Sequence, residues 1–247
     1  MADLRMTDRP VIEPRSRDAT VPIHDHLRRQ ILTGALPASS QLSQAQVAKD
    51  FGVSRGPVRE AFRLLQREGL IEAELNHRAT VSALSVPDVE HAYAVRIVNE
   101  SLALSVGVPR FTADELDRMD QLIAAVEQSK VHGYSAWEEQ HQCFHAMLLA
   151  HSGDLMRRSL ARWAEHTERY RRVYVSDERG GWTLGAAEHG QLAQACRARD
   201  VAGATTLLAR HLSRAALSLV ATMDPEHEPR LVRNAVRQVS RYPDTTG

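Results

Sequence analysis

Residues 42–70 read LSQAQVAKDFGVSRGPVREAFRLLQREGL, and this segment constrains the fold of the chain more than any other. Ser43 and Ser54 are placed to cap two short helices, and Gly52 between them offers the tight exit that ends the first helix. In the second helix the apolar residues follow one helical stripe, and the arginines lie off that stripe. The segment therefore predicts two helices joined by a short turn, the second with a basic outer face.

The flanking residues complete a small domain around this segment. An amphipathic helix is expected from about Pro22 until Gly34 and Pro37 end it. After residue 69 the runs LIEAEL and ATVSAL are prone to form strands, and the few polar residues between them predict a hairpin. We interpret residues 21–84 as a winged helix-turn-helix domain, preceded by a flexible arm over residues 1–20 that is rich in charge, Ser, Thr and Pro.

Beyond Ser85 the pattern changes to successive amphipathic helical stretches, with no further alternating strands. We expect helices at 88–106, 112–130, 134–151, 154–177, 184–198 and 200–222. Residues 88–222 then form an all-helical domain, and residues 223–247 form either a tail or a peripheral helix near 230–241. The expected fold class is α-dominated, with an N-terminal winged helix-turn-helix domain followed by an all-α helical bundle.

Composition excludes several classes of protein. The chain has 31 Lys and Arg against 31 Asp and Glu, so DNA binding must be argued from the placement of the arginines and not from net charge. The absence of a long apolar run and of a signal peptide predicts a cytoplasmic protein without a membrane span. Cys143 and Cys196 are too few for a disulfide framework, and we interpret both as buried small residues.

Residues 24–84, above all the run GVSRGPVREAFRLLQREGLI, resemble the N-terminal domain of the GntR family of bacterial transcription regulators. The resemblance implies binding to double-stranded operator DNA as a homodimer, because two recognition helices must meet two half-sites. Arg55 and Arg59 would contact bases or adjacent phosphates in the major groove, where a guanidinium can bond to guanine O6 and N7. On an isolated helix, the same arginines would be interpreted as a solvated face.

The remaining DNA contacts follow from the same resemblance. Ser43, Ser54 and Gly56 are assigned to the phosphate backbone. His77 and Arg78 form the tip of the wing, where members of the family often carry Arg-Gly.

Residues 88–221 resemble the FCD-type ligand-sensing domain of the FadR subgroup, through AVRIVNESLAL, HQCFHAMLLAHSGDL, EHGQLAQACRARDVAGA and ARHL. In that family a carboxylate, a histidine four residues later and two further histidines bind a divalent metal. The matching positions here are His141, His145, His189 and His211. His141 departs from the family, which usually has Asp at this position.

The residues themselves support part of this assignment. His141 and His145 are four apart, so one helix presents both imidazoles on one face. Such a pair alone is more often two ordinary histidines than a ligand set. Four uncharged nitrogen ligands favour zinc, with nickel as an alternative, over magnesium or calcium. In a second hypothesis His141 does not bind the metal, and a water or effector oxygen takes its place.

An effector site is expected beside the metal. Arg96 and Glu100 are spaced for a salt bridge along one helix, whereas the resemblance places Arg96 in the cavity, where it could clamp a small carboxylate. Arg162 is a second candidate for effector binding, and the arginines at 169, 171 and 172 are interpreted as facing solvent.

The leading hypothesis is a ligand-responsive transcription regulator, a repressor, that binds a small organic acid. A zinc hydrolase is disfavoured because HQCFH lacks the Glu that His-Glu-x-x-His enzymes use as general base. Two other hypotheses remain: the metal itself is the signal, or the helical domain serves only for dimerisation.

Overall fold

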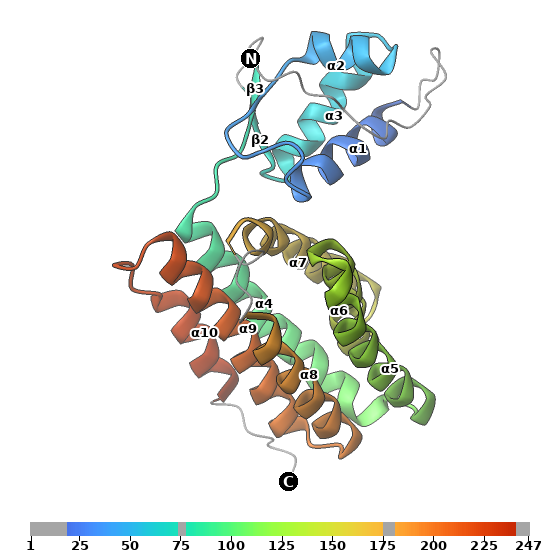
Figure 1. Ribbon diagram of the computed structural model, residues 1–247, viewed down its shortest axis with the longest axis vertical. Coiled ribbons are helices and arrows are strands. Elements are labelled where there is room, and N and C mark those ends of the chain that lie inside the picture. The colour runs from blue at the N-terminus through green and yellow to red at the C-terminus, as the bar shows by residue number, and fades with distance from the viewer. Residues whose placement is uncertain (1–18, 74–77, 175–180, 241–247) are drawn as a thin grey trace. The chain divides into compact units, whose positions relative to one another are not determined.

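The computed structural model describes residues 19–73, 78–174 and 181–240. The chain divides into two compact units between Leu84 and Ser85 (Figure 1). The helices of the first unit are α1 (Thr20–Leu32), α2 (Gln44–Phe51) and α3 (Arg55–Arg67).

The turn between α2 and α3 forms as the sequence predicts. The Ser43 hydroxyl accepts a hydrogen bond from the Gln46 amide at 3.4 Å and so caps α2. Gly52 ends α2 with φ +65°, a left-handed conformation that glycine adopts without steric cost. The apolar stripe of α3 is buried against α1, which leaves its arginines outside. The buried residues of that stripe are Val58, Ala61, Phe62 and Leu65.

A three-stranded antiparallel sheet completes this unit in the order β1-β3-β2. Its strands are β1 (Gln41–Leu42), β2 (Ile71–Ala73) and β3 (Ala79–Val81). The hairpin of β2 and β3 matches the predicted wing, although residues 74–77 at its tip lie outside the described residues. β1 was not predicted from the sequence, because a strand of two residues has no period to recognise.

The second unit is a bundle of helices built around the first of them. Its helices are α4 (Val86–Gly107), α5 (Ala113–Ser129), α6 (Tyr134–Leu148), α7 (Asp154–Tyr174), α8 (Gly181–Arg197), α9 (Val201–Met223) and α10 (Arg230–Ser240), with short 3-10 turns at Val108–Arg110 and Lys130–His132. α4 packs against α7, α9 and α10, while α5 packs against α6 and α8 (Figure 1). α6 is three residues shorter than expected, and the end of the expected helix 154–177 lies outside the described residues.

α10 lies in the segment for which the sequence allowed either a tail or a peripheral helix. Glu90 on α4 holds its first turn: Oε1 accepts the Leu231 amide at 3.0 Å, and Oε2 lies 2.7 Å from Nε2 of His227. Val232 and Ala235 are the buried residues of α10, which packs against α4 and α9. One carboxylate therefore ties the C-terminal helix to the start of α4.

The two cysteines differ in burial. Cys196 is buried as expected, but Cys143 is exposed, so its interpretation as a buried residue was wrong. Cys143 lies between His141 and His145 on α6, and a residue two positions from an inward side chain points to another side of a helix. In the described part of the chain, every helix is too short or too polar to cross a membrane.

Candidate metal centre and nucleic-acid interface

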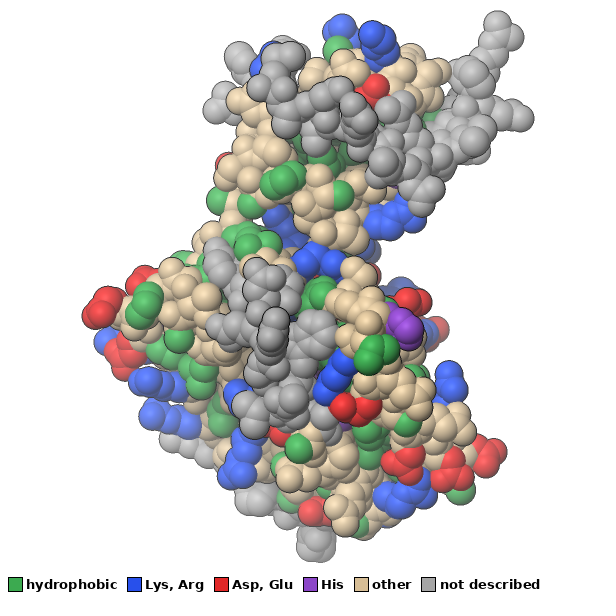
Figure 2. All heavy atoms as spheres, in the orientation of Figure 1, with side chains coloured by type: hydrophobic (Ala, Val, Ile, Leu, Met, Phe, Trp, Pro, Cys, Tyr) green, Lys and Arg blue, Asp and Glu red, His purple; other side chains and the backbone are tan. Residues whose placement is uncertain are grey.

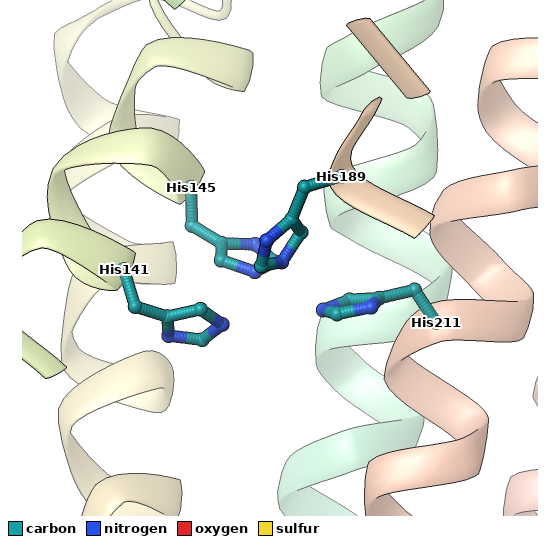
Figure 3. Close-up of side chains that lie close together, drawn as sticks. All are labelled: His141, His145, His189 and His211. Atoms are coloured by element: carbon teal, nitrogen blue, oxygen red, sulfur yellow. The ribbon is translucent and has the colours of Figure 1, made fainter. Parts of the chain in front are cut away.

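Four histidines from three helices point toward one another inside the helical unit (Figure 3). α6 contributes His141 and His145, α8 contributes His189, and α9 contributes His211. All four side chains are buried, and one potential ligand atom from each lies within 4.8 Å of the others. The structure therefore brings together every residue that the sequence assigned to the metal.

The ring nitrogens of this cluster have few partners. Both nitrogens of His145 and of His189, and Nδ1 of His141, are buried without a hydrogen-bond partner in the described residues. A buried polar atom left unpaired costs about 1–3 kcal/mol. A shared cation would supply a partner for one nitrogen of each ring, so the residues present fit a metal.

Burial also sets the charge of the cluster. It lowers the pKa of all four imidazoles below their ordinary value, and for His141 to about 4, although Glu138 raises that pKa. Neighbouring histidines lower the pKa of His145 and His189 further. The rings are therefore neutral at pH 7, which is the form that binds a metal.

Two carboxylates that the sequence did not single out lie behind the cluster. Glu188 Oε2 lies 2.7 Å from Nδ1 of His211, and Glu138 Oε2 lies 3.8 Å from Nδ1 of His141. Glu138 precedes His141 by three residues, so helical spacing could have indicated it. Nothing in the sequence indicates that Glu188 on α8 reaches α9.

A cavity of about 150 Å³ opens beside His141 and His145, and Arg96, Glu100 and Arg171 are among the residues that line it. Arg96 donates to Glu100 at 2.6 Å and to Thr167 at 2.8 Å. Arg96 therefore forms the salt bridge with Glu100 and also lines the cavity, and its contact with an effector stays a prediction. The pair is not exposed, since Arg96 is 2% and Glu100 1% accessible.

The interpretation of the arginines near the end of α7 as solvent-facing was wrong. Arg169 and Arg171 are buried, and Arg172 is partly buried. Arg171 pairs with Glu138 and donates to Thr167 at 3.1 Å, because this face of α7 packs against α4 and α6 and not against water. Arg162 is exposed on α7 and is not among the residues that line the cavity.

The first turns of α3 carry the residues assigned to DNA. Arg55 and Arg59 are exposed, and the Arg59 side chain retains 63% of its accessible surface. Ser54 occupies the N-cap position, but within the described residues its hydroxyl accepts no hydrogen bond from the first turn. A Cβ added at Gly56 would lie 3.8 Å from the Ser54 hydroxyl, so this glycine is not required by steric crowding.

The wing contributes one described side chain. Arg78 is exposed at the start of β3 and donates to Gln41 at 3.0 Å, so it is tethered to the neighbouring strand. His77 lies outside the described residues. On the helical unit, charged side chains of both signs are interspersed over the face that Figure 2 shows.

Comparisons with known proteins agree on both units. Residues 20–81 match the model of bacterial regulatory proteins of the gntR family, and residues 88–214 match that of the FCD domain. The chain is 30% identical to the uncharacterized HTH-type transcriptional regulator BphR of Paraburkholderia xenovorans, over 75% of this chain and 79% of that protein. It is 33% identical to the gluconate operon transcriptional repressor of Bacillus licheniformis over 42% of each chain. The solved structure of Escherichia coli McbR/YncC, 18% identical, has the same fold with a TM-score of 0.71, over 85% of this chain and all of that one.

The burial of neutral histidines predicts a pH-dependent stability. In the presence of a chelator, we expect the free energy of unfolding to fall as the pH decreases from 6.5 to about 4. The unfolded His141 takes up a proton near pH 6.5, whereas the folded one resists until about pH 4, a difference of about 3 kcal/mol. Urea unfolding of the parent and of His141→Gln at several pH values measures the difference in slope. His132→Gln, at an exposed position, is the control; equal slopes in the parent and His141→Gln would contradict the prediction.

Proposed function

This chain belongs to the gntR family of bacterial regulatory proteins and carries an FCD domain, and we propose that it is a repressor controlled by a small organic acid. It is a DNA-binding transcription regulator, and its family and relatives are regulators, not enzymes. The order of its two domains supports assignment to the FadR subgroup, and the name of the gluconate repressor supports repression. The observation that carries the proposal is the cavity beside four buried histidines.

In the proposed complex with DNA, the first turns of α3 enter the major groove. Arg55 and Arg59 contact base edges or adjacent phosphates, because both are exposed and lie one helical turn apart. The amide groups at Ser54 and Gly56 meet a phosphate at the positive end of the helix dipole. Ser43 adds a backbone contact, and Arg78 and His77 are assigned to the wing.

The four histidines would hold a divalent metal, with zinc or nickel fitting an all-nitrogen ligand set. When bound, the metal supplies a positive charge that neutral imidazoles do not compensate, and this favours an anion in the cavity. A volume of about 150 Å³ is below the roughly 300–1,000 Å³ of pockets for drug-sized molecules, which supports a small acid. Arg96 would contact the acid in competition with Glu100, its present partner.

Control of DNA binding would follow from linkage. An acid that displaces Glu100 from Arg96 changes the packing of α4, and α4 begins just after the boundary between the two units. We take the protein to have two arrangements, one with high and one with low affinity for DNA. The acid changes the DNA affinity by as much as its own binding free energy differs between these two arrangements.

A homodimer is supported by the outer face of α4. Val98, Leu102 and Val106 are exposed at intervals of four residues, with accessibilities of 38%, 53% and 39%. In α4, all of which the structure describes, Arg96 and Glu100 are buried and no other charged residue follows Glu90, so this face is uncharged. An open groove of about 530 Å³ adjoins it, lined by Val95 and Asn99 of α4 and by Leu155 and Trp163 of α7.

We assign this face to a second copy of the chain. In a twofold interface each copy offers the same patch, so that patch must be complementary to itself. This face carries both protruding apolar side chains and a groove. α4 has 22 residues and is about 33 Å long. About 25 Å of that length follows Glu90, and Leu155 and Trp163 of α7 widen the apolar strip.

Replacing Arg59 tests the DNA contact. With a duplex selected by the parent from a random-sequence pool, we expect Arg59→Ala to weaken binding by about 1–3 kcal/mol. Loss of a phosphate contact also reduces the slope of log affinity against log salt by about 1, whereas loss of a base contact relaxes sequence preference. Fluorescence anisotropy over a salt series measures both. Arg67→Ala, at the other end of α3, is the control, and an unchanged affinity and slope for Arg59→Ala would refute the assignment.

Metal content and ligand response test the helical unit. Protein purified without a nickel column is expected to contain one transition metal per chain, and His145→Ala with His211→Ala to lose it. Short hydroxy acids, dicarboxylates and sugar acids are then screened by thermal shift, and stabilisation that a chelator abolishes supports the acid sensor. His91→Ala, at an exposed position, is the control. If metal is bound, no acid stabilises the protein and the DNA affinity changes with the zinc concentration, the metal-sensor hypothesis is favoured. If no metal is bound, the metal site is refuted.

The dimer face is tested by one charge. We expect the parent to sediment as a dimer and Leu102→Glu as a monomer, because two carboxylates would be buried at the centre of the interface. Leu217→Glu, at an apolar residue of α9 that is 37% accessible, is the matched control. A dimeric Leu102→Glu would place the interface elsewhere, and a monomeric parent would refute the homodimer.

A further inference from the structure

Glu188 connects two helices of the metal centre. It precedes His189 on α8, so its side chain leaves the helix in a different direction and reaches α9 instead. There Oε2 lies 2.7 Å from Nδ1 of His211. Adjacent residues of α8 therefore have different positions: His189 is a candidate metal ligand, and Glu188 contacts another candidate ligand, His211.

The Glu188 carboxylate is itself held in orientation. Arg214 donates from Nε to Oε1 at 2.7 Å, and its Nη2 also contacts Oε2. His211 and Arg214 are three residues apart on α9, so both project toward the same side of the helix. The two contacts of the planar guanidinium fix the plane of the carboxylate, which a single contact would leave free to rotate.

This arrangement determines which ring nitrogen of His211 is available. A carboxylate accepts hydrogen bonds, so the hydrogen on the ring is placed on Nδ1 and the lone pair on Nε2. The other three histidines differ within the described part of the chain. His145 and His189 have no ring contact with a carboxylate, and the 3.8 Å between Glu138 and His141 is too long for a hydrogen bond.

We propose that Glu188 is a positioning residue of the metal centre, which acts through His211. It orients His211 and fixes its tautomer before the ion arrives, so that His211 is the preorganised ligand of the four. Glu138 has no equal role, because it stands off His141 and is engaged by Arg171. This inference rests on the proposed metal site.

The test compares two Glu→Gln variants of the full chain with zinc as the probe. Competition with a chromophoric chelator is expected to give a 10–100-fold weaker zinc affinity for Glu188→Gln. Glu115→Gln is the matched control, because Glu115 also lies close to a histidine, 3.1 Å from Nε2 of His151, away from the cluster.

A second measurement separates positioning from folding. Nitrogen chemical shifts of the metal-free protein are expected to show the proton of His211 on Nδ1 in the parent and a mixture of tautomers in Glu188→Gln. Zinc affinity of Glu188→Gln equal to the parent, or an equal loss in Glu115→Gln, would overturn the proposal, as would an unchanged tautomer. If the parent itself binds no zinc, the proposed metal site fails and not this assignment alone.

Discussion

The helical unit depends on how it accommodates charged side chains in an interior that excludes water. Burying an ionised group costs several kcal/mol unless an opposite charge and hydrogen bonds compensate it. Arg96 is compensated by Glu100 and Thr167, and Arg171 by Glu138. The pair of Arg96 and Glu100 lies within α4, whereas the Arg96 contact with Thr167 joins α4 to α7 and the Arg171 pair with Glu138 joins α7 to α6. Separating α6 from α7 would therefore leave an unpaired buried charge.

The histidines of the same interior follow a different rule. Burial keeps them neutral, which avoids the cost of a charge but leaves most of their ring nitrogens without partners in the described residues. The ion pairs therefore compensate buried charges, while the neutral histidines offer ring nitrogens that can bind a metal. A cavity lined by members of both groups can couple the two, since a ligand there meets Arg96 and His141 together.

The N-terminal unit has the opposite arrangement. Its hydrophobic core consists of apolar side chains, and the arginines assigned to DNA, Arg55, Arg59 and Arg78, are exposed. In the proposed function, DNA phosphates meet exposed charges that stay solvated until binding, and the small acid meets Arg96, which is buried. The division of the chain into two units keeps these two requirements apart.

Local sequence was sufficient for the features that depend on neighbours along the chain. The cap at Ser43, the left-handed turn at Gly52 and the shared helical face of His141 and His145 could all be predicted, while the meeting of the four histidines came from family resemblance. The roles of Arg171 and Glu188 could not be predicted, and β1 was too short to recognise. A charge at helical spacing looks the same in sequence whether its face meets water or another helix. Packing settles that question, because the partners of these residues lie 33 and 23 positions away.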